Sequence, residues 1–296
     1  MKKYIRLIVL ILVIIVITIL LFSRCSKKEN ETIIEFKDET LESMIKTELK
    51  KDKIYSSDLS EISGIMIAAD RVLGLSGGGH TDKSVILFGY DSFEYEDVRY
   101  TEFGTIKTLE DLKYFPKLTS IRIYLQPNID FNTIPNKGNI YNLGLSQNKI
   151  EDLSFLEGFD KLNYLTISSN NISNLKGIEN VNNIKRLGLN SNNINNIELL
   201  YNFNNLEHLD LTYNKVIDIN PISNLKKLEY LSLYENGISD ITGLSKIKTL
   251  NELYLNNNNI TDISALKDFE YFEVLNITEN PISNYEVIDH IENVVR

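Results

Sequence analysis

One stretch of the chain has the residue types of a hydrolase nucleophile. Gly74, Ser76 and Gly78 form a G-x-S-x-G motif, and His80 follows shortly after it. A nucleophile of this kind needs a strand, a sharp turn and a helix, with an acid and a histidine further along an α/β-hydrolase sheet. The surrounding sequence predicts none of that context. We therefore interpret the motif as part of a hairpin loop, and a hydrolase is the unlikely alternative for a chain that we expect not to be an enzyme.

A second set of side chains is suited to binding. His208 and Asp210 lie close in sequence, but no nucleophile or pocket is implied beside them, so they do not form a catalytic pair. They belong to a group rich in tyrosine and acid, which offers large contact area at small entropic cost and selects a basic or polar partner. The alternative is that tyrosine serves only as a good strand residue. The candidate binding residues are Tyr164, Arg186, His208, Asp210, Tyr213, Tyr230, Tyr234, Glu235, Glu252 and Tyr254.

The sequence offers little to a metal or a cofactor. Cys25 is the single cysteine, and no Cys/His cluster has zinc-ligand spacing. A regular column of short polar residues could be imagined as a cation ladder, but Asx turns at the corners of a repeat explain it better. We expect no metal and no cofactor. The column comprises Asp152, Asn174, Asn196, Asp218, Asp240, Asp262 and Asn284.

These side chains are positioned by a repeat of 22 residues. Each unit reads L-x-x-L-x-L-x-x-N-x-I-x-[DN]-I-x-x-L-x-x-L, and every apolar position is apolar in seven successive units. The first column comprises Ile140, Leu162, Ile184, Leu206, Leu228, Leu250 and Phe272, and the asparagine column Asn148, Asn170, Asn192, Asn214, Asn236, Asn258 and Asn280. Such a period predicts a solenoid.

Within one unit the spacing of apolar residues changes. Leu209 and Leu211 alternate as in a strand, whereas Val216, Ile219 and Ile222 recur every three residues, which suits 3-10 turns. One such coil cannot fold alone, so the coils must stack. The asparagine would satisfy backbone groups at the turn and pair with the asparagines above and below. The third, fifth and seventh residues of each unit should face the concave side.

The 22-residue unit, with DINPISNLKKLEYLSL at 218–233, resembles the internalin and SDS22-like class of leucine-rich repeats. The resemblance covers residues 106–293 and implies a right-handed α/β solenoid, with a parallel sheet on its concave face, short 3-10 turns on its convex face and a helical N-terminal cap. Members of this class bind different ligands on one scaffold, so the likeness implies binding without naming a partner.

The ends of the repeat differ from its centre. Residues 29–63 are assigned to a linker and the helical cap, with a helix at 38–51 after an Asp38 N-cap and a second short helix at SSDLSEI. Residues 64–105 form an irregular insert, in which IMIAAD and SVILFG are predicted to be strands joined by VLGLSGGGHTDK. The repeats span 106–293. A closing helix through Tyr285, Ile288, Ile291 and Val295 is expected in a C-terminal cap that reaches residue 296.

The chain begins with a membrane segment. Residues 7–22 contain one polar side chain, Thr18, and are flanked by basic residues within 1–28. A helix over 4–22 would span about 28 Å, close to the hydrocarbon thickness of a bilayer. We expect an uncleaved single-pass anchor. The alternative is a lipoprotein anchored at Cys25, although Arg24 stands where a lipobox has a small residue.

Charge limits the partners. The net charge is −10, and residues 1–28 carry six basic side chains and no acid, which leaves the remainder near −16. An acidic surface repels phosphate backbones, which argues against nucleic acid. The sequence therefore predicts a membrane-tethered module, on the outside of the cell, that binds a protein partner through its concave face. The alternative is a structural or regulatory envelope protein that docks a neighbouring membrane protein.

Overall fold

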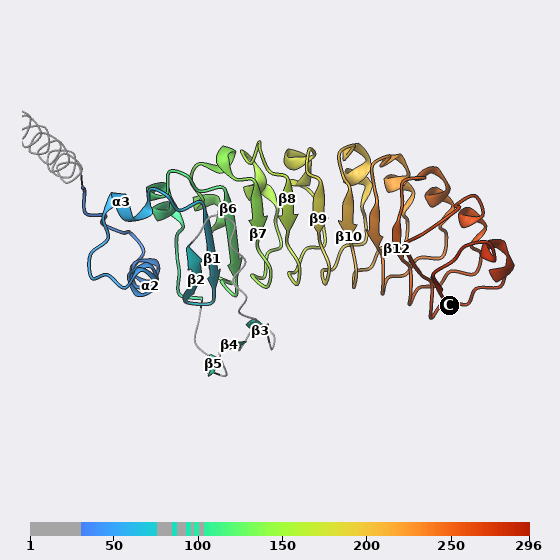
Figure 1. Cartoon of the computed structure of the whole chain (residues 1–296), viewed down its shortest axis with the longest axis horizontal. Coiled ribbons are helices and arrows are strands. Elements are labelled where there is room, and N and C mark those ends of the chain that lie inside the picture. Colours follow the sequence, from blue (N-terminus) through green and yellow to red (C-terminus); the bar gives the residue numbers. More distant parts are fainter. Residues whose placement is uncertain (1–30, 76–84, 88–92, 96–97, 101–103) are drawn as a thin grey trace, which may run out of the picture.

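The computed structural model describes residues 31–75, 85–87, 93–95, 98–100 and 104–296, and Figure 1 shows an elongated stack of coils. The predicted membrane segment, Cys25, Ser76 and His80 lie outside these residues. Among the described residues no helix is long and apolar enough to cross a bilayer.

The coils share an 11-stranded sheet with the order β14-β13-β12-β11-β10-β9-β8-β7-β6-β1-β2. Neighbouring strands from β6 to β14 run parallel, and from β6 to β13 each residue pairs with the residue 22 positions further on, as the period requires. The strands of the repeat are β6 (Ser120–Tyr124), β7 (Asn142–Gly144), β8 (Tyr164–Thr166), β9 (Arg186–Gly188), β10 (His208–Asp210), β11 (Tyr230–Ser232), β12 (Glu252–Tyr254), β13 (Val274–Asn276) and β14 (Val294–Val295).

Short 3-10 turns return the chain from one strand to the next, as the three-residue spacing predicts. The apolar columns meet between turns and strands, where Leu209, Leu211 and Ile222 are fully buried. The turns are η1 (Glu110–Tyr114), η2 (Phe131–Thr133), η3 (Lys137–Asn139), η4 (Ser154–Leu156), η5 (Ile178–Val181), η6 (Glu198–Asn202), η7 (Asn220–Asn224), η8 (Thr242–Lys246), η9 (Ser264–Leu266) and η10 (Tyr285–Ile288).

The asparagine column binds the backbone of the preceding coil. Asn192 Nδ2 donates to the Ile167 carbonyl at 2.9 Å, and its Oδ1 accepts from the N–H of Ile172 at 3.1 Å. The same pair of bonds recurs from Asn170 to Asn280. The expected bonding to turn backbone is confirmed. Among the described residues, however, no bond joins the side chains of two column asparagines, because both amide ends are taken by backbone groups.

Six of the seven residues of the second polar column form the expected Asx turn, whereas Asn284 Oδ1 accepts instead from the N–H of Ile263 at 3.1 Å. The backbone N–H two residues on donates to the side chain of Asp152, Asn174, Asn196, Asp218, Asp240 and Asp262. Among the described residues no cluster of three or more His, Cys, Asp or Glu side chains could hold a metal ion. Hydrogen bonds from Ser154 and Thr242 lower the pKa of Asp152 and Asp240 below the ordinary aspartate value.

These two aspartates make the fold sensitive to acid. Because their folded pKa is lowered, their contribution to stability is present above the unfolded pKa of about 3.9 and is lost as pH falls through the folded value. An Asp152→Asn, Asp240→Asn variant keeps the turn bond, as Asn174 and Asn196 do, but cannot be protonated. In thermal unfolding at pH 6 and pH 3 we expect the variant to lose less stability than the wild type; an equal loss would contradict this assignment.

The N-terminal helices are present at α2 (Glu39–Leu49) and α3 (Ser56–Leu59), and Asp38 is the N-cap as predicted, accepting from the N–H of Leu41 at 2.9 Å. Two buried carboxylates join α2 to the first coil. Asp38 Oδ2 accepts from the N–H of Lys107 at 2.7 Å, and Asp111 Oδ2 accepts from the N–H groups of Lys37 and Asp38 at 2.8 Å. Each carboxylate thus accepts hydrogen bonds from the backbone of the segment that carries, or adjoins, the other carboxylate.

The structure corrects the prediction for residues 64–105. The first predicted strand is present as β1 (Gly64–Ala68), but it pairs antiparallel with β2 (Arg71–Leu75), inside the stretch that was expected to link two strands. β1 also pairs parallel with β6, so this hairpin extends the main sheet. β3 (Val85–Leu87), β4 (Phe93–Tyr95) and β5 (Val98–Tyr100) form a separate small sheet.

The hairpin explains an exception in the asparagine column. Gln126 stands where the later units have asparagine, and its Nε2 donates to the carbonyl of Ala69, between β1 and β2. The place before β6 in the sheet is occupied by the β1–β2 hairpin rather than by a coil of the repeat. The side chain that bonds this hairpin is one methylene longer than asparagine.

The predicted closing helix at the C-terminus is wrong. Residues 285–288 form the 3-10 turn η10, and the chain ends in the two-residue strand β14, which pairs with β13. The apolar residues of this segment occupy the turn positions of the repeat, so they follow the repeat geometry.

Candidate functional site

Seven of the ten predicted binding residues lie on the strands β8 to β12, on the face of the sheet away from the core, and the other three, Tyr213, Tyr234 and Glu235, follow β10 and β11. Strand pairing puts Tyr164, Arg186, His208, Tyr230 and Glu252 side by side in one row. A second row contains Asp210, Ser232 and Tyr254. The leucine between the two rows is buried in each strand, as strand alternation requires. We call the candidate binding residues together the strand-face patch.

The centre of the patch is a continuous group of rings. His208 stacks on Tyr230 with centroids 5.7 Å apart, and Tyr230 contacts Tyr254 with centroids 5.6 Å apart. The hydroxyl of Tyr254 donates to Glu252 Oε2 at 3.2 Å. Ring edges, hydroxyls and a carboxylate therefore form one surface across three coils.

A second group lies where the strands turn. The hydroxyl of Tyr213 donates to that of Tyr234 at 3.0 Å, and this bond, more than burial, raises the pKa of Tyr234 to about 12. Glu235 accepts a bond from Asn257. Tyr213 and Glu235 have positive φ angles of 53° and 58°, in the left-handed region. Among the described residues no ring contact joins this group to the group around Tyr230, so the predicted patch consists of separate clusters.

A third cluster lies towards the N-terminus of the sheet. Arg186 lies 5.7 Å above the ring of Tyr164, and Tyr164 contacts Tyr141 with centroids 5.2 Å apart. Tyr141 was missed by the sequence reasoning, which took its candidates from the third, fifth, seventh and eighth positions of each unit. Its signal was a large aromatic residue at the second position, next to the strand.

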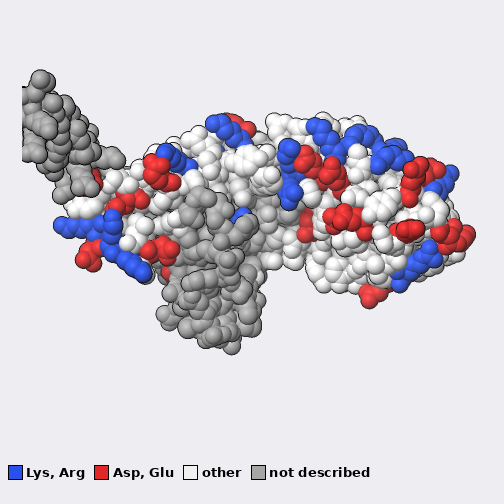
Figure 2. Space-filling model, in the orientation of Figure 1, with Lys and Arg blue, Asp and Glu red and all other residues white. Residues whose placement is uncertain are grey.

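Among the described residues, the electrostatics of the patch indicate no proton-transfer pair. Burial, and then the nearby Arg186, lower the pKa of His208, which favours the neutral ring. Burial, and then the charge of Asp210, raise the pKa of Tyr230. Asp210 Oδ1 accepts from the N–H of Thr212, and no bond joins Asp210 to His208 among the described residues. Figure 2 shows acidic and basic side chains intermixed over the C-terminal half of the face in view.

Comparison with known proteins places the fold. Residues 204–246 match the family described as leucine-rich repeats in two copies. Internalin C2 of Listeria monocytogenes is 25% identical, with a TM-score of 0.56, over 88% of this chain and 92% of that one. Internalin F of the same organism is 22% identical, with a TM-score of 0.52, over 88% and 94%. No curated protein matches the sequence.

Proposed function

From the premise that the chain is an internalin-like leucine-rich-repeat protein, we propose that it is a recognition module that binds a protein partner through the strand-face patch on its concave side. The observation that carries the proposal is the row of rings from His208 through Tyr230 to Tyr254, which lies outside the core on three consecutive strands. Solenoids of stacked repeats provide such extended surfaces for binding.

The patch combines apolar area with selective charge. The rings bury area in a contact, and tyrosine loses little side-chain entropy because it has two rotatable bonds. The strands beneath are held by buried leucines such as Leu209 and Leu231, so the rings are positioned before a partner arrives. Asp210 and Glu252 then favour a partner with basic or polar groups.

The test removes three rings together in a Tyr230→Ala, Tyr234→Ala, Tyr254→Ala variant. The full chain in detergent is immobilised and offered proteins from the surrounding medium and, separately, from the envelope of its own cells. Captured proteins are identified, and their Kd is measured with purified material. We expect the triple variant to bind at least about tenfold more weakly, which corresponds to about 1.4 kcal/mol or more.

Tyr271→Ala is the matched control, because Tyr271 is 56% exposed and lies outside the patch. It should bind like the wild type. Unchanged binding by the triple variant would remove the patch from the proposal. Capture only from the chain's own envelope would favour a structural or regulatory envelope protein over a surface receptor or adhesin.

We further propose that residues 4–22 anchor the chain in the cell membrane and that the repeats lie outside. The apolar run of 7–22 with basic flanks supports the anchor, and the orientation is tested separately. Protease added to intact cells should then digest the repeats, and a protected repeat region would contradict the orientation. Mass spectrometry of the membrane-extracted N-terminus distinguishes an uncleaved anchor from a lipid on Cys25.

A further inference from the structure

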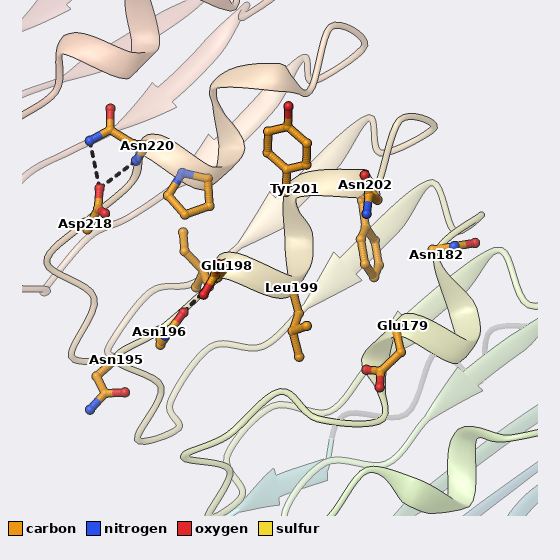
Figure 3. A pocket seen from close by; sticks show the side chains of 13 residues that line it. Glu179, Asn182, Asn195, Asn196, Glu198, Leu199, Tyr201, Asn202, Asp218 and Asn220 are labelled. Atoms are coloured by element: carbon orange, nitrogen blue, oxygen red, sulfur yellow. Dashed lines mark hydrogen bonds between the residues drawn. The ribbon is translucent and has the colours of Figure 1, made fainter.

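The opposite face of the solenoid carries a groove that the strand-face patch does not use. It lies around η6, has a volume of about 700 Å³ and is lined by the turns of three consecutive coils. Figure 3 shows Leu199 and Tyr201 projecting from η6, with Glu179 on the coil before and Asp218 on the coil after. A volume of this size is within the range of ligand-binding clefts.

The groove exists because one coil departs from the repeat. At the sixteenth position of the unit, Leu199 stands between Gly177 and Pro221 in the adjacent coils, and at the eighteenth position Tyr201 stands between Glu179 and Ser223. Large side chains between smaller ones leave a hollow beside them.

Neither large side chain is needed for the core. Leu199 is 41% exposed and Tyr201 52% exposed, whereas Leu200 and Phe203 of the same turn are fully buried. Packing of the coil therefore does not explain why the residues at these two positions are apolar and aromatic. Contact with another molecule would bury them.

The charge of the groove is of one sign. Its charged lining residues are Glu179, Glu198 and Asp218, and within the described part of the chain none of them forms an ion pair. The amides of Asn182, Asn195 and Asn202 also line the groove, and their side chains bond no other described residue. The groove thus offers three unneutralised carboxylates and several amide donors and acceptors around an apolar centre.

We propose that this groove binds an extended, basic polypeptide segment of a partner protein. Its lysine or arginine side chains would meet the carboxylates, its apolar side chains would cover Leu199 and Tyr201, and its backbone would bond the asparagine amides. The site is separate from the strand-face patch, so the solenoid would contact partners on two faces.

The probe is a labelled peptide that alternates lysine with leucine and phenylalanine. A second peptide has glutamate in place of lysine, and a third has serine in place of the apolar residues. Binding to the full chain in detergent is measured by fluorescence anisotropy, and backbone NMR shifts identify the site. We expect the first peptide to bind, with shifts at residues 195–203, and the other two to bind at least tenfold more weakly.

The variant Leu199→Ala, Tyr201→Ser introduces residue types that other coils already have, as Ala265 and Ser223 at the same positions, so it should fold. It should lose binding at least tenfold. Ile217→Ala, which changes a 63% exposed residue outside the groove lining, is the control and should bind normally.

The triple tyrosine variant should also bind the peptide normally, which separates this proposal from the strand-face patch. Three results would overturn it: no binding of the first peptide, equal binding by the groove variant, or equal binding of the glutamate peptide. Self-association that the groove variant abolishes would also overturn it and would identify a second copy as the occupant.

Discussion

Asn192→Ala should lower the free energy of unfolding by about 2–5 kcal/mol, because it leaves buried backbone groups without partners. Its side chain is 7% exposed and bonds the N–H of Ile172 and the carbonyls of Ile167 and Leu189. Asn214 also donates to the Leu189 carbonyl, so the groups that lose most are those of Ile172 and Ile167. A buried backbone group without a partner costs about 1–3 kcal/mol.

Asn193→Ala is the matched control for this substitution. Asn193 is the next residue and is exposed, and its backbone N–H donates to the Ile172 carbonyl, a bond that alanine keeps. Urea unfolding followed by circular dichroism should show the loss for Asn192→Ala and a change within about 0.5 kcal/mol for Asn193→Ala. Equal stability of the two variants would mean that water replaces the amide at no cost.

The asparagine column shows what a repeat makes predictable. A fixed period predicts which residues share a column. Because buried polar side chains need hydrogen-bond partners, a polar column inside an apolar unit is expected to bond backbone groups. The same period predicts that Arg186, His208 and Tyr230 share one row, and the strand pairing confirms it. Where the period is unbroken, the fold and the rows of the site follow from the sequence.

Other features depend on contacts that the period does not encode. The eighth residue of each unit has a positive φ angle whatever its type, from Gln147 to Tyr213 to Glu279, so residue type gave no signal for this turn. The bond between Tyr213 and Tyr234 follows from that turn and was not foreseen as a pair. The hairpin of β1 and β2 was missed because residues 71–75 do not belong to the repeat.

Gly177→Ala should destabilise the fold by about 2–4 kcal/mol. Gly177 precedes η5 with φ +102°, and a Cβ there would lie 2.7 Å from both the carbonyl carbon and the oxygen of Leu153 and 3.0 Å from the nitrogen of Ser154. All three atoms are backbone of the preceding coil, so no side-chain rotation relieves the contact. A left-handed backbone in alanine adds its own cost.

Gly243 occupies the same position three units later and provides the control. A Cβ there would have as its nearest atom Oδ1 of Asn220, at 3.2 Å, which is the end of a side chain, and φ is not in the left-handed region. Gly243→Ala should therefore change stability by less than about 1 kcal/mol and can even raise it by restricting the unfolded chain. Thermal unfolding of the two variants tests the difference. Equal losses of stability would mean that the position in the repeat determines the cost. A larger loss for Gly177→Ala, as expected, would assign the cost to the close approach of Gly177 to the backbone of the preceding coil.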